Sequence, residues 1–130
     1  MDYRCLIVTL ATLALTACGP SPDDLNDYAQ EYLYLELSMG LHDGSHVDAY
    51  FGPEELKTAS ETTALNLDQI LKASKDLSAR LSSIDVGDDK MLAMRVAGLI
   101  ARLHALDTRI AINKSEFPSF DDESMALFGS

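Results

Sequence analysis

The amino-acid sequence predicts an all-α fold, either a small antiparallel helical bundle or a helical hairpin accompanied by short helices. Apolar residues recur at alternating spacings of three and four along most of the chain, which places them on one face of a helix. No segment alternates apolar and polar residues with period two, so no sheet is predicted. The 130 residues are 47% hydrophobic and 24% charged, which suits one modest globular domain.

We expect the first seventeen residues to be a targeting segment and not to be part of the folded domain. Arg4 lies in a short polar start, and residues 5–17 form a run without a charge. A helix that crosses a bilayer needs about 20 apolar residues, so this shorter run has the length of a signal-peptide core. We expect residues 18–22 to be a tether and residues 23–130 to be a single helical domain.

A cysteine with small residues before it, Cys18, follows the uncharged run. The string Leu15-Thr16-Ala17-Cys18 resembles the lipobox of bacterial lipoproteins. The resemblance implies that the thiol of Cys18 is alkylated with diacylglycerol and that the first seventeen residues are then removed as a lipoprotein signal peptide. It also implies that the protein belongs to the bacterial cell envelope and is attached to the membrane through this lipid. In a Gram-negative host the protein would lie at the periplasmic face of the outer membrane. The alternative is an uncleaved anchor or a plain secretory signal, with Cys18 an ordinary thiol.

The first helix of the domain is predicted from one long apolar face. Its face-forming residues are Leu25, Tyr28, Tyr32, Leu35 and Met39. The apolar stripe is widened by Leu33, Leu37 and Leu41. A stripe of this width predicts that the helix is covered on more than one side. Gly40 and the turn-forming residues 42–45 end the helix.

A second helical region is predicted from about Pro53, with Glu54 and Glu55 in its first turn. One short turn of helix is expected over residues 47–51, before Gly52 and Pro53 break the chain. The core face of the second region carries Ile70, Leu77, Leu81 and Ile84, with Ala73 or Ser74 in the gap.

The last long helix has the most regular apolar face in the chain. Residues 85–88 form a turn before it, and Asp88 or Asp89 can cap it. Its apolar face consists of Leu92, Val96, Leu99, Leu103, Leu106 and Ile110. On the opposite side three arginines recur every seven residues, and they are Arg95, Arg102 and Arg109. After Pro118, a final short amphipathic helix is predicted over residues 120–128, closed by Gly129.

Charge is unevenly distributed along the chain. The formal net charge is −11, which argues against nucleic acid or an anionic membrane surface as a partner. Residues 19–61 carry ten acidic residues and one basic residue, whereas residues 62–115 carry six acidic and eight basic residues. The acidic first helix is one candidate neighbour of the arginine row. The favoured alternative is that the row forms a solvated helix face.

The candidate functional residues of the domain lie in one turn. His42 and His46 are four residues apart, and with Asp43 and Asp48 they could surround a divalent ion. However, Gly44 lies between the histidines, and Asp43 occupies the position where an H-E-x-x-H motif needs its glutamate. A capped, solvated turn is therefore the favoured interpretation, with a ligand-binding turn as the alternative. The sequence predicts no catalytic residue, no metal site and no cofactor.

Residues 32–43, the string H-D-x-x-x-V-D-A-Y-x-G-P that begins at His42, and residues 102–112 with 120–129 share one resemblance. Together they resemble the N-terminal region of large, largely helical bacterial proteins related to zinc metallopeptidases. The resemblance implies a helical fold and an envelope location. The metal-binding motif of those proteins lies downstream of this region, and residues 18–130 contain no match to it. The resemblance therefore implies no peptidase activity for this chain.

Three functions remain open from the sequence. The favoured one is a lipid-anchored, non-catalytic helical module of the cell envelope, with a binding or structural role and an unknown protein partner. The second is the N-terminal piece of a metallopeptidase-like lipoprotein whose remainder was lost or is encoded separately. The third is a small metal- or ligand-binding lipoprotein that uses the turn between His42 and Asp48.

Overall fold

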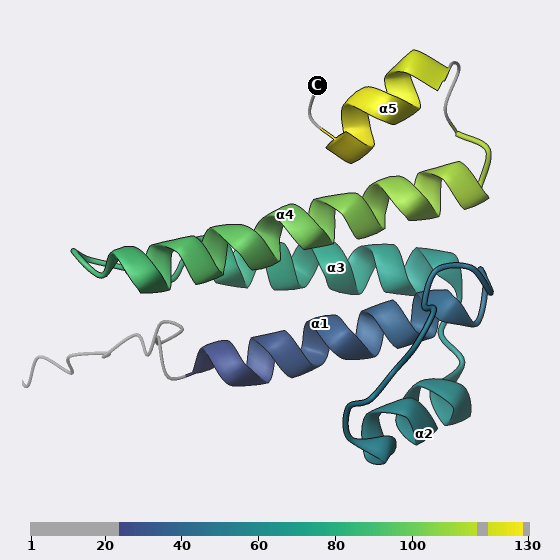
Figure 1. Cartoon of the computed structure of the whole chain (residues 1–130), viewed down its shortest axis with the longest axis horizontal. Helices are drawn as coiled ribbons and strands as arrows, with labels where there is room; N and C mark the ends of the chain where they lie inside the picture. Colours follow the sequence, from purple (N-terminus) through teal and green to yellow (C-terminus); the bar gives the residue numbers. More distant parts are fainter. Residues whose placement is uncertain (1–23, 117–119, 129–130) are drawn as a thin grey trace, which may run out of the picture.

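Five α-helices form the domain (Figure 1). The computed structural model describes residues 24–116 and 120–128, and these residues contain no strand. The helices are α1 (Leu25–Gly40), α2 (Glu54–Thr63), α3 (Leu67–Ser82), α4 (Lys90–Asn113) and α5 (Phe120–Phe128). The predicted all-α class is confirmed. The predicted signal peptide, Cys18 with its tether, Pro118 and Gly129 lie outside the described residues.

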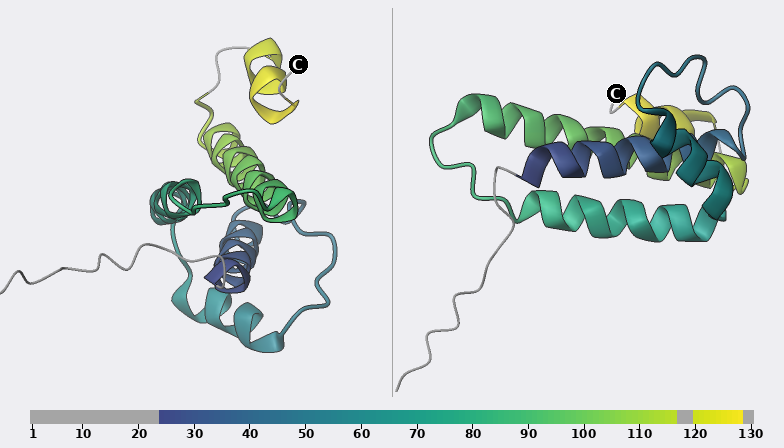
Figure 2. Two further views of the ribbon diagram at one scale, coloured as in Figure 1. Left: turned by 90° about the vertical axis from the view of Figure 1, so that its left-hand side faces the viewer. Right: turned by 90° about the horizontal axis from the view of Figure 1, so that it is seen from below.

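The three longest helices pack side by side, and the two short ones lie outside them. α3 runs opposite to both α1 and α4, so α1 and α4 run in the same direction (Figures 1 and 2). α2 packs against α1, and α5 packs against α4 on the far side of the molecule. This is a helical bundle with short additional helices, as the sequence predicts.

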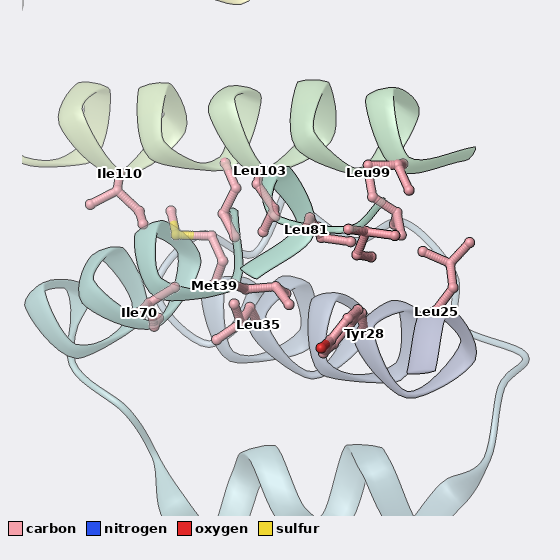
Figure 3. Packing of buried hydrophobic residues seen from close by; sticks show 13 residues of the cluster. Leu25, Tyr28, Leu35, Met39, Ile70, Leu81, Leu99, Leu103 and Ile110 are labelled. Carbon is pink, nitrogen blue, oxygen red and sulfur yellow. The ribbon is translucent and has the colours of Figure 1, made fainter. Parts of the chain in front are cut away.

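The hydrophobic core lies between α1, α3 and α4 (Figure 3). The buried apolar side chains that form it are Leu25, Tyr28, Leu35, Met39, Ile70, Leu77, Leu81, Ile84, Val96, Leu99, Leu103, Leu106 and Ile110. The predicted faces are thus confirmed, except that Tyr32 and Leu92 are only partly buried. Complete burial of a leucine-sized side chain contributes about 1.5–3 kcal/mol, so this cluster is the main source of stability.

α1 is covered on two sides, as its wide apolar stripe predicts. The face with Leu35 contacts α3 and α4, and the opposite side contacts α2. Leu37 is buried on the second side. Leu33 and Leu41 remain exposed, so the added stripe is only partly covered.

The single helical region expected from Pro53 onwards is wrong, because the chain forms two helices there. Ala64 adopts a left-handed conformation with φ 47° after α2, and α3 starts three residues later. A capping box explains this start: Asn66 Oδ1 accepts a hydrogen bond from the Gln69 amide, and Gln69 Oε1 accepts one from the Asn66 amide, both at 2.9 Å. The N-x-x-Q spacing of Asn66 and Gln69 is the sequence pattern that predicts this helix start.

The turn of helix expected over residues 47–51 is also wrong. Residues 41–53 contain turns and bends and no helix. Their polar groups bond elsewhere: the Tyr50 hydroxyl donates to the Pro53 carbonyl over 3.0 Å, outside any helical pattern. Proline also disfavours the helical conformation of the residue before it, here Gly52. We call residues 41–53 the connecting segment.

The turn between α3 and α4 follows the sequence prediction. Asp85 Oδ1 accepts a hydrogen bond from the Gly87 amide over 3.0 Å, and Gly87 has a φ of 47°, which glycine adopts without strain. Of the two candidate caps, Asp89 is the one that caps α4, because its carboxylate accepts from the Leu92 amide over 2.9 Å. The turn therefore fixes the start of α4.

Candidate functional site

The four candidate residues of the predicted turn make separate contacts. His42 Nε2 donates to the Leu65 carbonyl oxygen over 2.6 Å, which joins the turn to the start of α3. His46 bonds through Nε2 to the carboxylate of Glu36 on α1. The two imidazoles thus have different partners on different elements. Among residues 24–116 and 120–128, no group of three or more histidine, cysteine or carboxylate side chains is placed to hold a metal ion.

Asp43 joins the turn to α4. Its Oδ1 accepts hydrogen bonds from the Ser45 amide over 3.0 Å and the Ser45 hydroxyl over 2.7 Å. Its Oδ2 lies 3.2 Å from Nε of Arg109. The Ser45 bonds, with smaller contributions from Asn113 and Arg109, lower the pKa of Asp43 below its usual value. Asp43 therefore stabilises the turn and also pairs with the guanidinium group of Arg109 on α4.

A chain of polar side chains lies beneath the turn, and the sequence prediction missed it. Glu36 bonds to His46, and the Tyr32 hydroxyl interacts with the same carboxylate. Burial raises the pKa of Tyr32 well above its usual value, and the negative charge of Glu36 adds to the shift, while Arg102 opposes it. Tyr32 and Glu36 are four residues apart and share one helix face, and this spacing could have predicted their interaction.

The arginine row of α4 lies beside α1 and is solvated only in part. Arg109 is half-buried in its ion pair with Asp43. Arg95 is exposed, and one of its guanidinium nitrogens donates to Asn26 Oδ1 over 3.3 Å. Arg102 is exposed as well. Arg95 is therefore both next to α1 and exposed to solvent, whereas Arg109 is partly buried against the connecting segment.

A groove of about 290 Å³ opens beside the connecting segment. The end of α1, residues 47–50 and one side of α2 form its walls. Asp48 is the one candidate residue that lines it, together with Tyr50 and Glu61. Phe51, the next residue of the segment, has a side chain that is 98% exposed. The groove and this phenyl group offer a contact surface.

Comparison with known proteins yields no relative. No family model matches the chain, and neither the search of curated proteins nor the search of solved structures finds a match. Within the described part of the chain, none of the helices has the length and apolar character needed to span a membrane. The function is therefore inferred from the residues and their geometry.

Proposed function

We propose that this protein is a lipid-anchored, non-catalytic helical module of the bacterial cell envelope, with a binding or structural role. The observation that carries the proposal is the Leu15-Thr16-Ala17-Cys18 string behind an uncharged run too short to span a bilayer. Lipidation at Cys18 would make the thioether-linked lipid the only membrane attachment. An N-terminus that carries several acyl chains is a stable anchor, whereas a single chain is marginal.

The short distance in sequence between Cys18 and the first helix supports a role close to the membrane. α1 begins at Leu25, seven residues after Cys18. Each extended residue spans at most about 3.6 Å, so the tether could reach no further than roughly 25 Å. The lipid would therefore hold the N-terminal end of α1 near the bilayer surface.

The contacts of the two turn histidines favour a non-catalytic role. Zinc catalysis uses about three protein ligands and an open position for water. His42 and His46 bond to different elements, and His104 lies far along α4. A binding role draws support from the groove beside the connecting segment and from the exposed phenyl group of Phe51, the residue after Tyr50 in that segment.

Mass spectrometry of the membrane-extracted protein tests the anchor. We expect an intact mass that corresponds to cleavage before Cys18 and to an acylated cysteine. Cys18→Ser should abolish acylation and leave the uncleaved precursor. Cys5→Ser is the matched control, because Cys5 belongs to the removed segment and its loss should leave the mature mass unchanged. An unmodified Cys18 in the membrane-extracted protein would contradict the proposal.

A further inference from the structure

A second pocket lies between α1 and α4, outside the turn and the groove described above. It has a volume of about 200 Å³ and is lined by five residues, Leu25, Ala29, Arg95, Leu99 and Arg102. Leu25 and Leu99 are nearly completely buried, whereas both arginines are exposed. The pocket therefore has an apolar floor and a rim that carries two guanidinium groups.

The two rim arginines differ from the other arginines of the described chain. Arg80 pairs with Glu31 on α1, and Arg109 pairs with Asp43. Neither Arg95 nor Arg102 forms an ion pair within residues 24–116 and 120–128. Arg95 donates only to the neutral amide oxygen of Asn26, and the group near Arg102 is the Tyr32 phenol. In a chain with a net charge of −11, two neighbouring guanidinium groups that form no ion pair among the described residues point to an anionic ligand.

The position of the pocket indicates where that anion comes from. The N-terminal ends of α1 and α4 lie at the same end of the bundle (Figure 1). Leu25, the first residue of α1, forms part of the pocket floor. The proposed lipid on Cys18 is only seven residues away in sequence, so the pocket would lie at the end of the domain that faces the bilayer.

We propose that this pocket binds the headgroup of an anionic phospholipid from the membrane that holds the anchor. Guanidinium groups bind phosphate oxygens through paired, charge-assisted hydrogen bonds. The phosphate would lie between Arg95 and Arg102, and the glycerol carbons would lie on the floor formed by Leu25, Ala29 and Leu99. The membrane source of the ligand rests on the proposed anchor, while the pocket and its anion preference do not.

The negative charge of the protein favours binding of a headgroup in the pocket over general attraction to an anionic membrane surface. Asp85, Asp88 and Asp89 lie in the α3–α4 turn at the same end of the bundle, and they oppose a general attraction to an anionic surface. Tethering raises the effective concentration of headgroups at the pocket, which lets a weak site be occupied. The ligand would therefore fix how the domain is oriented on the membrane, without a need for strong affinity.

Arginine footprinting on vesicles tests this proposal. The full chain is extracted from membranes and reconstituted into vesicles of phosphatidylcholine alone or mixed with phosphatidylglycerol. Mass spectrometry then follows the modification of each arginine by phenylglyoxal. We expect phosphatidylglycerol to slow modification of Arg95 and Arg102 several-fold and to leave Arg80 and Arg109 unchanged. Equal rates at Arg95 and Arg102 in the two kinds of vesicle would overturn the proposal.

Two variants and one further condition sharpen the test. Arg102→Gln should remove the protection of Arg95, whereas Lys90→Gln, which removes one positive charge from the first residue of α4 outside the pocket lining, should retain it. Protection by inorganic phosphate in phosphatidylcholine vesicles, equal to that by phosphatidylglycerol, would assign the site to a free anion and overturn the lipid source. The intact mass of the same sample reports acylation of Cys18, so a failure of the anchor is seen separately from a failure of the pocket.

Discussion

The three-helix core and the connecting segment are held in place by different interactions. In the core, buried apolar side chains from α1, α3 and α4 pack on one another. The connecting segment is instead fixed by polar contacts to three other parts of the chain, through His42, Asp43 and His46. Apolar packing is distributed over many side chains, whereas each polar contact is a single point of attachment. A substitution in the core should therefore destabilise the whole domain, whereas a substitution in the connecting segment should release only that segment.

The largest effect is expected from a cavity in the core. Leu103 is completely buried on α4, and Leu103→Ala should lower the free energy of unfolding by about 2–5 kcal/mol. Chemical denaturation followed by circular dichroism measures this change. Leu33→Ala is the control, because Leu33 is exposed on α1 and its truncation should change stability by less than about 1 kcal/mol. A similar loss in both variants would contradict the assignment of the core.

A smaller and local effect is expected from the connecting segment. The imidazole of His46 and the carboxylate of Glu36 are both largely buried. His46→Ala should cost about 1–3 kcal/mol, because the largely enclosed Glu36 carboxylate loses its bond to the imidazole. Amide exchange in residues 41–53 should accelerate while the helical content stays the same. His104→Ala, at an exposed position of α4, should leave exchange in the segment unchanged, and a uniform acceleration over all helices would contradict a local role.

The two regions should also respond to pH with opposite signs. Asp107, a partly buried residue of α4, represents the helices that form the core. Burial raises its pKa, with small opposing contributions from Ser74, Lys75 and His104. Its Oδ1 is enclosed and has no hydrogen-bond partner among the described residues. A raised pKa contributes stability below the usual value of 3.8 that is lost as pH rises through the folded value. Asp107→Asn should therefore raise the melting temperature at neutral pH, and this gain should shrink in acid.

Asp43 represents the connecting segment and gives the smallest effect. Its pKa lies below the usual 3.8, so its contribution is present above that value and is lost as pH falls through the folded value. Asp43→Asn should flatten the acid limb of the melting-temperature profile and slightly lower the melting temperature at neutral pH, because it removes the carboxylate charge beside Arg109 while the amide oxygen of asparagine still accepts from Ser45. A steeper acid limb in this variant would contradict the sign of the shift.

The two regions also differ in how much of them could be predicted from the sequence, because one depends on local spacing and the other on contacts between distant residues. The face of α4 follows from the spacing of its own residues, and the Asp89 cap lies next to the helix that it caps. The contacts of the turn could not be predicted in this way. His46 bonds to a residue 10 positions away and His42 to one 23 positions away, and no local pattern encodes such pairs. The left-handed Ala64 was missed because alanine rarely adopts a positive φ.

The order in which the helices pack has a consequence for how the chain folds. α3 and α4 are joined by a short turn and form an antiparallel hairpin of local contacts, whereas α1 reaches both of them only across α2 and the connecting segment. Closing a longer loop costs more chain entropy, so we expect the α3–α4 hairpin to form first and α1 to dock last. Until then the apolar face of α1 would stay open to solvent. Pulsed hydrogen exchange during refolding should show protection of the α1 amides after those of α4.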